Sequence, residues 1–339
     1  MNSCTKIYLV SSLAVSLAAP GFASVTVNAP VNATEVTSPF TVSANSATCS
    51  NQIVGYMGYS LDNSSDTTIV KGSSVDASVT SPTGAHVLHV KSWGEKGSAC
   101  VADVSLTVNP PQTSNPVPNE AISVSALQTL SGWKNASDPA TSGSSSGTTS
   151  TTNSPSLSGT ARMFQTQFRN DGGQLYHVSF GDDETSTHFL YDTWIYLNDS
   201  ASSIANIEMD MNQVMTNGET VIYGFQCDGW SGTWDYTKNA GTPSRPVDTW
   251  VHSKSACNVK TWSRNTWHHV QISYSRDESG NVTYNSVTLD SVEKQINATV
   301  PSAFALGWAP TLLTNFQLDG DVAQGTSVVY IDQLTISRW

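Results

Sequence analysis

The 339-residue sequence has few charged residues, and basic residues are the scarcer of the two signs. Asp, Glu, Lys and Arg make up 12% of it, and 15 basic residues against 27 acidic ones give a formal net charge of −12. A chain this acidic repels the phosphates of nucleic acids and the anionic head groups of lipids. We therefore expect neither a nucleic acid nor a membrane as its partner.

The sequence also lacks an apolar run long enough to cross a bilayer as a helix, which takes about 20 residues. Its one sustained apolar run, 7–19, follows Lys6, and small residues flank Phe22 just beyond the end of the run. This arrangement is typical of a secretory signal peptide, here 1–23, cleaved near Ala23. We expect a secreted protein that is extracellular or located at the cell surface.

Cysteine is scarce, with five residues in the whole chain, and Cys4 would leave with the signal peptide. The remaining four can pair in three ways, and disulfides persist in the oxidising compartments that exported proteins reach. Pairing Cys49 with Cys100 and Cys227 with Cys257 keeps each bridge within one predicted domain. We expect this pairing.

Helical periodicity is missing from every segment of useful length, whereas stretches with apolar residues at alternate positions recur throughout the chain. About seven such stretches in 24–108 predict a small β-sandwich, and roughly a dozen in 120–339 predict a larger jelly roll. The Pro-rich segment 109–119 between them predicts an extended linker. A run rich in Ser, Thr and Gly, 142–154, predicts a flexible surface loop in the second domain.

The first predicted domain, 24–108, resembles the bacterial immunoglobulin-like modules of exported proteins. The resemblance rests on Ala-Pro at 29–30, Ser-Pro-Phe-Thr-Val at 38–42 and the strand pattern of 84–93. It implies a spacer or an adhesion platform.

Strict alternation marks the segment 206–212 as a strand with two different faces. One face holds the apolar residues Ile207, Met209 and Met211, and the other holds Asn206, Glu208, Asp210 and Asn212. Two acids on one face, with no Lys or Arg beside them, raise at least one pKa, as paired-carboxylate chemistry requires. The alternative is a solvated strand face without a functional role.

The segment 208–213, Glu-Met-Asp-Met-Asn-Gln, resembles the Glu-x-Asp-x-x-Glu strand of retaining glucanases with a concanavalin A-like jelly roll. The stretch 266–272, with Asp277, Gly280 and Asp290 after it, and the final strand 328–334 are similar to strands that close laminin-G and glucanase sandwiches. The resemblance covers about 160–339. It implies an all-β fold whose concave sheet binds a polysaccharide, with Glu208 as nucleophile and Asp210 assisting it.

The sequence departs from this family at the position of the acid/base residue. Gln213 stands there, or Asn212 if the strand has no bulge. An amide can hydrogen-bond a glycosidic oxygen but cannot protonate it, and general acid catalysis contributes about 10²–10⁴-fold. Two-carboxylate hydrolysis would need another acid, such as Asp228 or Asp235, at about 5–5.5 Å from Glu208.

The segment 227–236, Cys-Asp-Gly-Trp-Ser-Gly-Thr-Trp-Asp-Tyr, alternates aromatic and acidic residues in a Gly-rich stretch. Rings stack on the apolar faces of sugars while carboxylates accept bonds from hydroxyls, so Asp228, Trp230 and Trp234 are candidate sugar contacts. Trp230, between a Gly and a Ser, is the better candidate for exposure. The alternative for Trp234 is a place in the core.

Motifs of other chemistries are missing. The spacing of His252, His268 and His269 matches no zinc site, and there is no Gly-x-Ser-x-Gly element of a serine hydrolase. We expect no cofactor. The alternative is a structural Ca²⁺ ion bound by the oxygen-rich loops.

Together these patterns predict a secreted protein that binds a neutral polysaccharide through Glu208, Asp210, Asn212, Gln213 and nearby tryptophans. The first alternative is an active glycoside hydrolase, or a polysaccharide lyase, that uses Glu208 with an unidentified second acid. The second alternative is a structural cell-surface adhesin.

Overall fold

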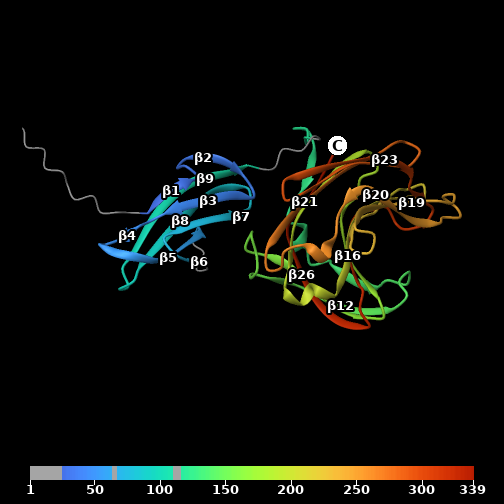
Figure 1. Cartoon of the computed structure of the whole chain (residues 1–339). Helices are drawn as coiled ribbons and strands as arrows, with labels where there is room; N and C mark the ends of the chain where they lie inside the picture. The colour runs from blue at the N-terminus through green and yellow to red at the C-terminus, as the bar shows by residue number, and fades with distance from the viewer. Residues whose placement is uncertain (1–24, 63–66, 110–115) are drawn as a thin grey trace, which may run out of the picture. The chain divides into compact units, whose positions relative to one another are not determined.

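The computed structural model describes residues 25–62, 67–109 and 116–339 (Figure 1). The predicted signal peptide and residues 110–115 of the predicted linker lie outside the described residues. Strands dominate, which confirms the all-β prediction, and only short 3₁₀ turns interrupt them: η1 (Leu127–Thr129), η2 (Asp199–Ser203) and η3 (Val259–Thr261). No helix among the described residues could cross a membrane.

The chain divides into two compact units. The first contains the residues up to Glu35 together with Thr41–Ser78 and Ala85–Thr107. The second contains Val36–Phe40, Val79–Gly84 and Val108–Trp339. The immunoglobulin-like character of the first unit stays a prediction.

The first unit holds two antiparallel sheets. The smaller sheet has the order β1 (Thr26–Ala29), β3 (Phe40–Asn45), β7 (Ser74–Val79). The larger has the order β2 (Thr34–Thr37), β9 (Ala99–Asn109), β8 (Gly84–Gly94), β5 (Gln52–Leu61), β4 (Thr48–Cys49), with β6 (Thr68–Lys71) on β5. The predicted disulfide between Cys49 and Cys100 is present in this unit.

The second unit consists of two larger sheets, whose labelled strands can be followed in Figure 1. The eight-stranded sheet has the order β12 (Ser144–Thr152), β13 (Ala161–Arg169), β26 (Gln324–Arg338), β15 (His188–Leu197), β21 (Trp267–Arg276), β22 (Asn281–Leu289), β23 (Val292–Pro301), with β10 (Ile122–Val124) on β26. The nine-stranded sheet has the order β11 (Lys134–Ser137), β14 (Gly173–Gly181), β25 (Thr311–Gly320), β16 (Ile204–Val214), β18 (Phe225–Asp228), β19 (Thr233–Asn239), β20 (Asp248–Ala256), with β17 (Thr220–Tyr223) on β16 and β24 (Ala303–Phe304) on β17.

The core of the second unit is filled by the apolar faces of its two sheets, as in a β-sandwich. The predicted apolar face of β16, with Ile207, Met209 and Met211, is fully buried in it. Aromatic rings fill much of the remaining volume, and Phe164 of β13 stacks on Phe316 of β25 at 5.0 Å between ring centroids. Packing on one face leaves the other face of each sheet free for polar residues.

The prediction of a flexible loop at 142–154 is wrong, because most of this run forms the edge strand β12. It pairs with β13 over nine residues, from Ser144 opposite Arg169 to Thr152 opposite Ala161. Thr has a high propensity for β-strands. The backbone of β13 provides the hydrogen-bond partners of this strand, and the sequence of 142–154 alone does not predict that pairing. Gly147 is required here, because a Cβ atom at this position would lie 2.1 Å from the hydroxyl of Tyr176.

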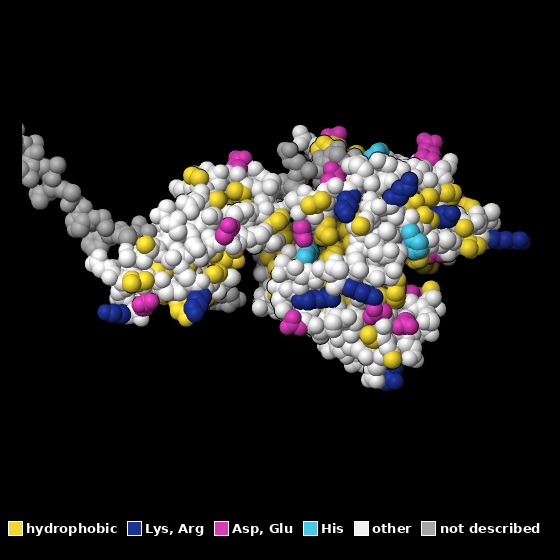
Figure 2. All heavy atoms as spheres, viewed as in Figure 1, with side chains coloured by type: hydrophobic (Ala, Val, Ile, Leu, Met, Phe, Trp, Pro, Cys, Tyr) yellow, Lys and Arg dark blue, Asp and Glu magenta, His cyan; other side chains and the backbone are white. Residues whose placement is uncertain are grey.

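Charged side chains are sparse on the surface. Figure 2 shows them scattered over the face in view, most of which is drawn white, as uncharged polar side chains or backbone. A cluster of several acidic side chains in the second unit is therefore a candidate functional site.

Candidate functional site

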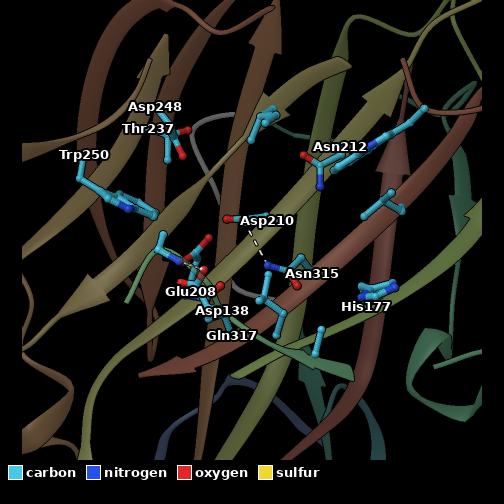
Figure 3. A pocket seen from close by; sticks show the side chains of 16 residues that line it. Asp138, His177, Glu208, Asp210, Asn212, Thr237, Asp248, Trp250, Asn315 and Gln317 are labelled. Atoms are coloured by element: carbon cyan, nitrogen blue, oxygen red, sulfur yellow. Dashed lines mark hydrogen bonds between the residues drawn. The ribbon is translucent and has the colours of Figure 1, made fainter. Parts of the chain in front are cut away.

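The polar face of the nine-stranded sheet borders a cavity of about 490 Å³, which we call the groove (Figure 3). The strand β16 runs through it, and Glu208, Asp210 and Asn212 line it. These are the residues that alternation placed on the polar face of this strand. Their carboxylates and amide form the centre of the groove floor.

The neighbouring strand β25 extends the floor on one side. Gln317 lies opposite Glu208, and Asn315 lies opposite Asp210, in the antiparallel register of the two strands. Directly opposite residues on one face of a sheet lie about 4.5–5.5 Å apart at Cβ, so their side chains touch. On the next strand, β14, His177 lies opposite Asn315 and also lines the groove.

Two tryptophans and two further acids also line the groove. Trp250 and Asp248 come from β20, on the far side of β16, and Asp138 follows β11. Trp308, in the segment before β25, is 48% exposed. The groove therefore combines an acidic and amide-rich floor with the indole rings of Trp250 and Trp308.

Hydrogen bonds hold the floor in place. The Nδ2 of Asn315 donates to Oδ2 of Asp210 at 3.4 Å, and the backbone N–H of Phe225 donates to Oδ1 of Asp210 at 3.1 Å. The Nε2 of Gln317 donates to Asp138 at 3.1 Å and to Asp319 at 3.0 Å. The amide nitrogens of Asn315 and Gln317 thus donate to the surrounding carboxylates.

Burial and mutual repulsion favour the protonated form of these acids. Burial raises the pKa of Asp210 to about 6 and that of Asp319 to about 7. Burial raises the pKa of Glu208 well above its usual range, and repulsion from Asp210, Asp319 and Asp138 raises it further. The raised pKa favours the protonated form of the Glu208 carboxyl, whereas the nucleophile that the glucanase resemblance implies acts as a carboxylate.

Two amide oxygens of the floor have no hydrogen-bond partner among the described residues. Oδ1 of Asn212 and Oδ1 of Asn315 are buried and accept no hydrogen bond from any described residue. Asn206, next on the same face of β16, likewise has an unpartnered Oδ1. Buried acceptors without a donor are costly, and the great majority in native proteins are paired.

The structure places Gln213 outside the groove and thereby corrects the expectation that it replaces the acid/base residue. β16 pairs regularly with β25 from Asn206 to Val214, so position 213 falls on the core face. Its Oε1 accepts from Nε of Arg276 at 2.6 Å, and its Nε2 donates to the carbonyl of Asp183 at 2.7 Å. Gln213 is a structural residue at one end of the sandwich.

Trp234 also faces the core, contrary to its expected role as a sugar contact. Only 1% of it is exposed, and its ring stacks on Phe225 at 5.4 Å between centroids. Trp230 is 54% exposed and lines a second depression with Lys260, Asp319 and Asp321, among others. That depression adjoins the groove, because Asp319 bonds to Gln317 of the groove floor.

Asp228 and Asp235, the candidates for a second acid, do not line the groove. The carboxylate of Asp228 accepts from the backbone N–H groups of Trp230 and Ser231, which closes a turn. Asp235 is fully buried and accepts from Nδ1 of His252 at 2.8 Å. In the strand register Asp228 lies opposite Asn206, as a diagonal neighbour of Glu208 on the same face, whereas Asp235 lies two strands away from Glu208.

Among the described residues, one group has side chains close enough to share a metal ion. Ligand atoms of Asp228, Asp235 and His252 lie within 4.8 Å of one another. The carboxylate of Asp228 already accepts the backbone hydrogen bonds that close the turn, and that of Asp235 accepts a hydrogen bond from His252. This group therefore has a structural explanation without an ion.

Several residues that line the groove were not predicted from the sequence, among them seven with charged, amide or aromatic side chains. Asn315 and Gln317 alternate with the apolar residues Phe316 and Leu318 along β25, a signal that was present in the sequence. The others come from separate places in the chain and carried no local signal: Asp138, His177, Asp248, Trp250 and Trp308.

The second unit also holds the other predicted disulfide, between Cys227 and Cys257. It joins the end of β18 to the segment that follows β20. The two bridges agree with the expected pairing, and each lies within one unit.

Neither a family model nor a curated protein sequence matches this chain. Similar solved structures include one concerning the promiscuous specificity of carbohydrate-binding modules from the β-sandwich superfamily. Its sequence is 10% identical, the TM-score is 0.35, and the match covers 93% of this chain and 98% of that one. The cellulose-induced protein Cip1 has 13% identity, a TM-score of 0.36, and coverage of 60% and 90%. Arcelin-5, a lectin-like defence protein from Phaseolus vulgaris, has 12% identity, a TM-score of 0.33, and coverage of 61% and 99%. At these values the likeness concerns the β-sandwich fold alone.

Proposed function

We propose that this protein binds a polysaccharide without acidic groups in the groove of its second unit. The observation that carries the proposal is the arrangement of Trp250 and Trp308 beside a floor of carboxylates and amides. Ligand sites commonly combine apolar and aromatic walls with a few placed polar groups. Indole rings stack on the apolar faces of sugars, and the floor accepts hydrogen bonds from hydroxyls.

The chemistry of the floor selects against acidic polymers. Asp138, Glu208, Asp210 and Asp248 all line the groove, and no Lys or Arg stands among its described lining residues. A uronic acid would bring a further carboxylate into this site without a cation to meet it. This argues against the polysaccharide lyase alternative, because the lyase substrate carries such a group.

The open groove also bears on the adhesin alternative, in which the face around Glu208 would be covered by protein. Trp308 is largely exposed, and the groove is accessible along the sheet. An open aromatic and acidic groove favours a glycan over a structural protein contact.

Hydrolysis remains a second candidate function, because the floor holds carboxyls with different pKa values. Burial and the neighbouring acids raise the pKa of Glu208 well above its usual range, whereas the pKa of Asp210 is raised to about 6. A pair of acids whose pKa values are pushed apart can supply a general acid and a general base. In that case Glu208 would be the acid, and Asp210 would be the base.

We propose further that the protein is exported. Its two disulfides fit the oxidising environment outside the cytosol. Mass spectrometry of the N-terminus of the mature protein tests cleavage near Ala23.

A glycan array tests the binding proposal, followed by a reducing-sugar assay on every glycan that binds. We expect binding to non-acidic polysaccharides without release of reducing ends. Failure to bind any glycan on the array would overturn the proposal. Release of reducing ends, lost in Glu208→Gln, would establish the hydrolase instead.

A further inference from the structure

We propose that the polysaccharide bound in the groove continues along the sheet into the second depression and stacks on Trp230 there. This inference rests on the proposed function and deepens it, because it adds a second binding subsite and requires a chain of several sugar units. The second depression, which we call the Trp230 depression, has a volume of about 620 Å³.

The Trp230 depression and the groove lie on the same face of the nine-stranded sheet. Gln317 lines the groove and Asp319 lines the depression, and these two residues occupy alternate positions of β25. Side chains at alternate positions point to the same face, about 7 Å apart along the strand. The segment after β11 borders both sites as well, because Ala140 lines the groove and the next residue, Thr141, lines the depression. A chain that leaves the groove past Gln317 therefore reaches the depression next.

The register of the strands places Trp230 beyond this same end of the groove. Asp319 lies opposite Asn206 on β16, and Asn206 lies opposite Asp228 on β18. Asn206 comes two positions before Glu208, on the face of β16 that holds the groove residues. Trp230 follows Asp228 in the turn after β18. Trp230 therefore lies just past the Glu208 end of the groove floor.

The turn that carries Trp230 is held in place by several interactions. The carboxylate of Asp228 accepts from the backbone N–H of Trp230 at 2.8 Å. The backbone N–H of Gly229 donates to the carbonyl of Ala205 at 2.8 Å, and Cys227, just before the turn, forms a disulfide. The side chain of Trp230 is nevertheless 54% exposed. A ring that is fixed in this way loses little conformational entropy when a ligand stacks on it.

Trp230 and Trp308 are the two exposed tryptophans among the described residues, and they lie at opposite ends of β25. Trp308 lines the groove and comes just before Thr311, where β25 begins, whereas Trp230 lines the depression together with Asp319. Thr311 and Asp319 are eight positions apart, which corresponds to about 26 Å of extended strand. A polysaccharide that stacks on both rings must therefore follow β25 and β16 over several sugar units.

The path between the two tryptophans suits an uncharged chain. Figure 3 shows Asn212, Asp210 and Glu208 following one another along β16, and the depression lies beyond Glu208. Among the described residues that line the depression, Lys260 is the only basic one, and it forms an ion pair with Asp321. The depression thus offers no free cation to an acidic sugar, so it fits the same class of polymer as the groove.

A second stacking contact adds affinity only for chains that are long enough to reach it. Sugar units bound in the groove hold the following units close to Trp230, which raises their effective concentration there. An oligosaccharide too short to leave the groove gains nothing from this ring. We therefore expect the affinity to rise with chain length, and Trp230 to account for part of that rise.

Isothermal titration of the full-length mature protein with β-1,3-linked and β-1,4-linked glucose oligomers, from the trisaccharide to the octasaccharide, tests this dependence on length. If the glycan array selects another uncharged polysaccharide, its oligomers of the same lengths replace these. We expect Trp230→Ala to weaken binding of the octasaccharide at least about fivefold and to change binding of the trisaccharide by less than about twofold. Trp250→Ala, in the groove, should weaken binding of both.

Two further variants serve as controls, and thermal melts show whether each variant is folded. Trp230→Phe keeps an aromatic ring and should retain most of the gain with chain length. Trp267→Ala removes an indole ring from β21 of the other sheet and should change binding at neither length.

Three outcomes would contradict these expectations. An equal loss for trisaccharide and octasaccharide in Trp230→Ala, or no loss for either, would overturn the inference while leaving the proposed function intact. An octasaccharide that binds the unmodified protein no more tightly than the trisaccharide would also overturn it. Binding of no oligomer, together with an empty glycan array, would instead overturn the proposed function.

Discussion

Asn315 donates a hydrogen bond to the carboxylate of Asp210 across two neighbouring strands, while its own amide oxygen has no partner among the described residues. The amide nitrogen of Gln317 likewise donates to carboxylates, those of Asp138 and Asp319. In each case a side-chain amide of β25 donates to acids of the protein itself, which fixes the position of the groove floor.

The buried acids of the groove should make the protein less stable as the pH rises. The pKa values of Asp210 and Asp319 are raised to about 6 and about 7. Between about pH 4 and pH 7 the folded state then binds more protons than the unfolded chain, so the free energy of unfolding falls as the pH rises. We expect the Tm to drop by at least about 3 °C between pH 4.5 and 7.5.

Thermal melts of the ligand-free protein check this dependence. The charged and titratable groups around Asp210 are Glu208, Asp138, Asp248, Asp319 and His177. Asp210→Asn should reduce the slope of Tm against pH, and Asp182→Asn should leave it as in the unmodified protein. A Tm that stays constant or rises across this window in the unmodified protein contradicts the assigned pKa directions.

Gln213→Glu should produce no hydrolytic activity, because this side chain lies on the core face of β16. The change should destabilise the fold by about 1–3 kcal/mol, since a carboxylate oxygen would replace the Nε2 that donates to the carbonyls of Asp183 and Ser186. Urea denaturation and a reducing-sugar assay measure the two effects. Hydrolysis gained by this variant would show that the residue reaches the sugar after all.

Asp332 should be one of the most sensitive positions for stability in the second unit. It is fully buried, and its carboxylate accepts from the backbone N–H groups of Leu157 and Ser158 and from Nε2 of Gln128. It thereby fastens the loop before β13 and the turn η1 to the last strand. Asp332→Ala leaves several buried donors unmet and should cost at least about 3 kcal/mol.

Urea denaturation of Asp332→Ala, compared with Asp182→Ala, measures this cost. The control removes an acid of the same kind from the surface and should change the unfolding free energy by less than about 0.5 kcal/mol. Equal midpoints for the two variants would contradict the anchoring role.

The sequence predicted the parts of the fold and of the site that depend on local periodicity. Alternation along 206–212 placed Glu208, Asp210 and Asn212 together, and the structure has them on one face. The six-residue motif misplaced Gln213, because its family spacing needs a bulge, whereas β16 pairs regularly with β25. Trp234 was ambiguous for a similar reason, since its face depends on the register of β19.

The rest of the groove depends on which strands become neighbours, and single-sequence patterns do not specify this. Asp138 and Asp248 are more than 100 positions apart, and the order β11-β14-β25-β16-β18-β19-β20 is what brings them to one cavity. The strand β12 was missed because its Ser- and Thr-rich sequence lacks an apolar face. Its partner β13 supplies the ladder that makes it a strand.

The affinity of tryptophan variants for an oligosaccharide identified on the array tests the central claim most directly. Trp250→Ala and Trp308→Ala each remove an indole ring from the groove, and Trp267→Ala removes one from β21 of the other sheet as the matched control. If the groove binds the sugar, each groove variant should weaken binding at least tenfold, about 1.4 kcal/mol, while the control binds as the unmodified protein does. Unchanged affinity in both groove variants, with all proteins folded, would contradict the claim that this groove is the glycan-binding site.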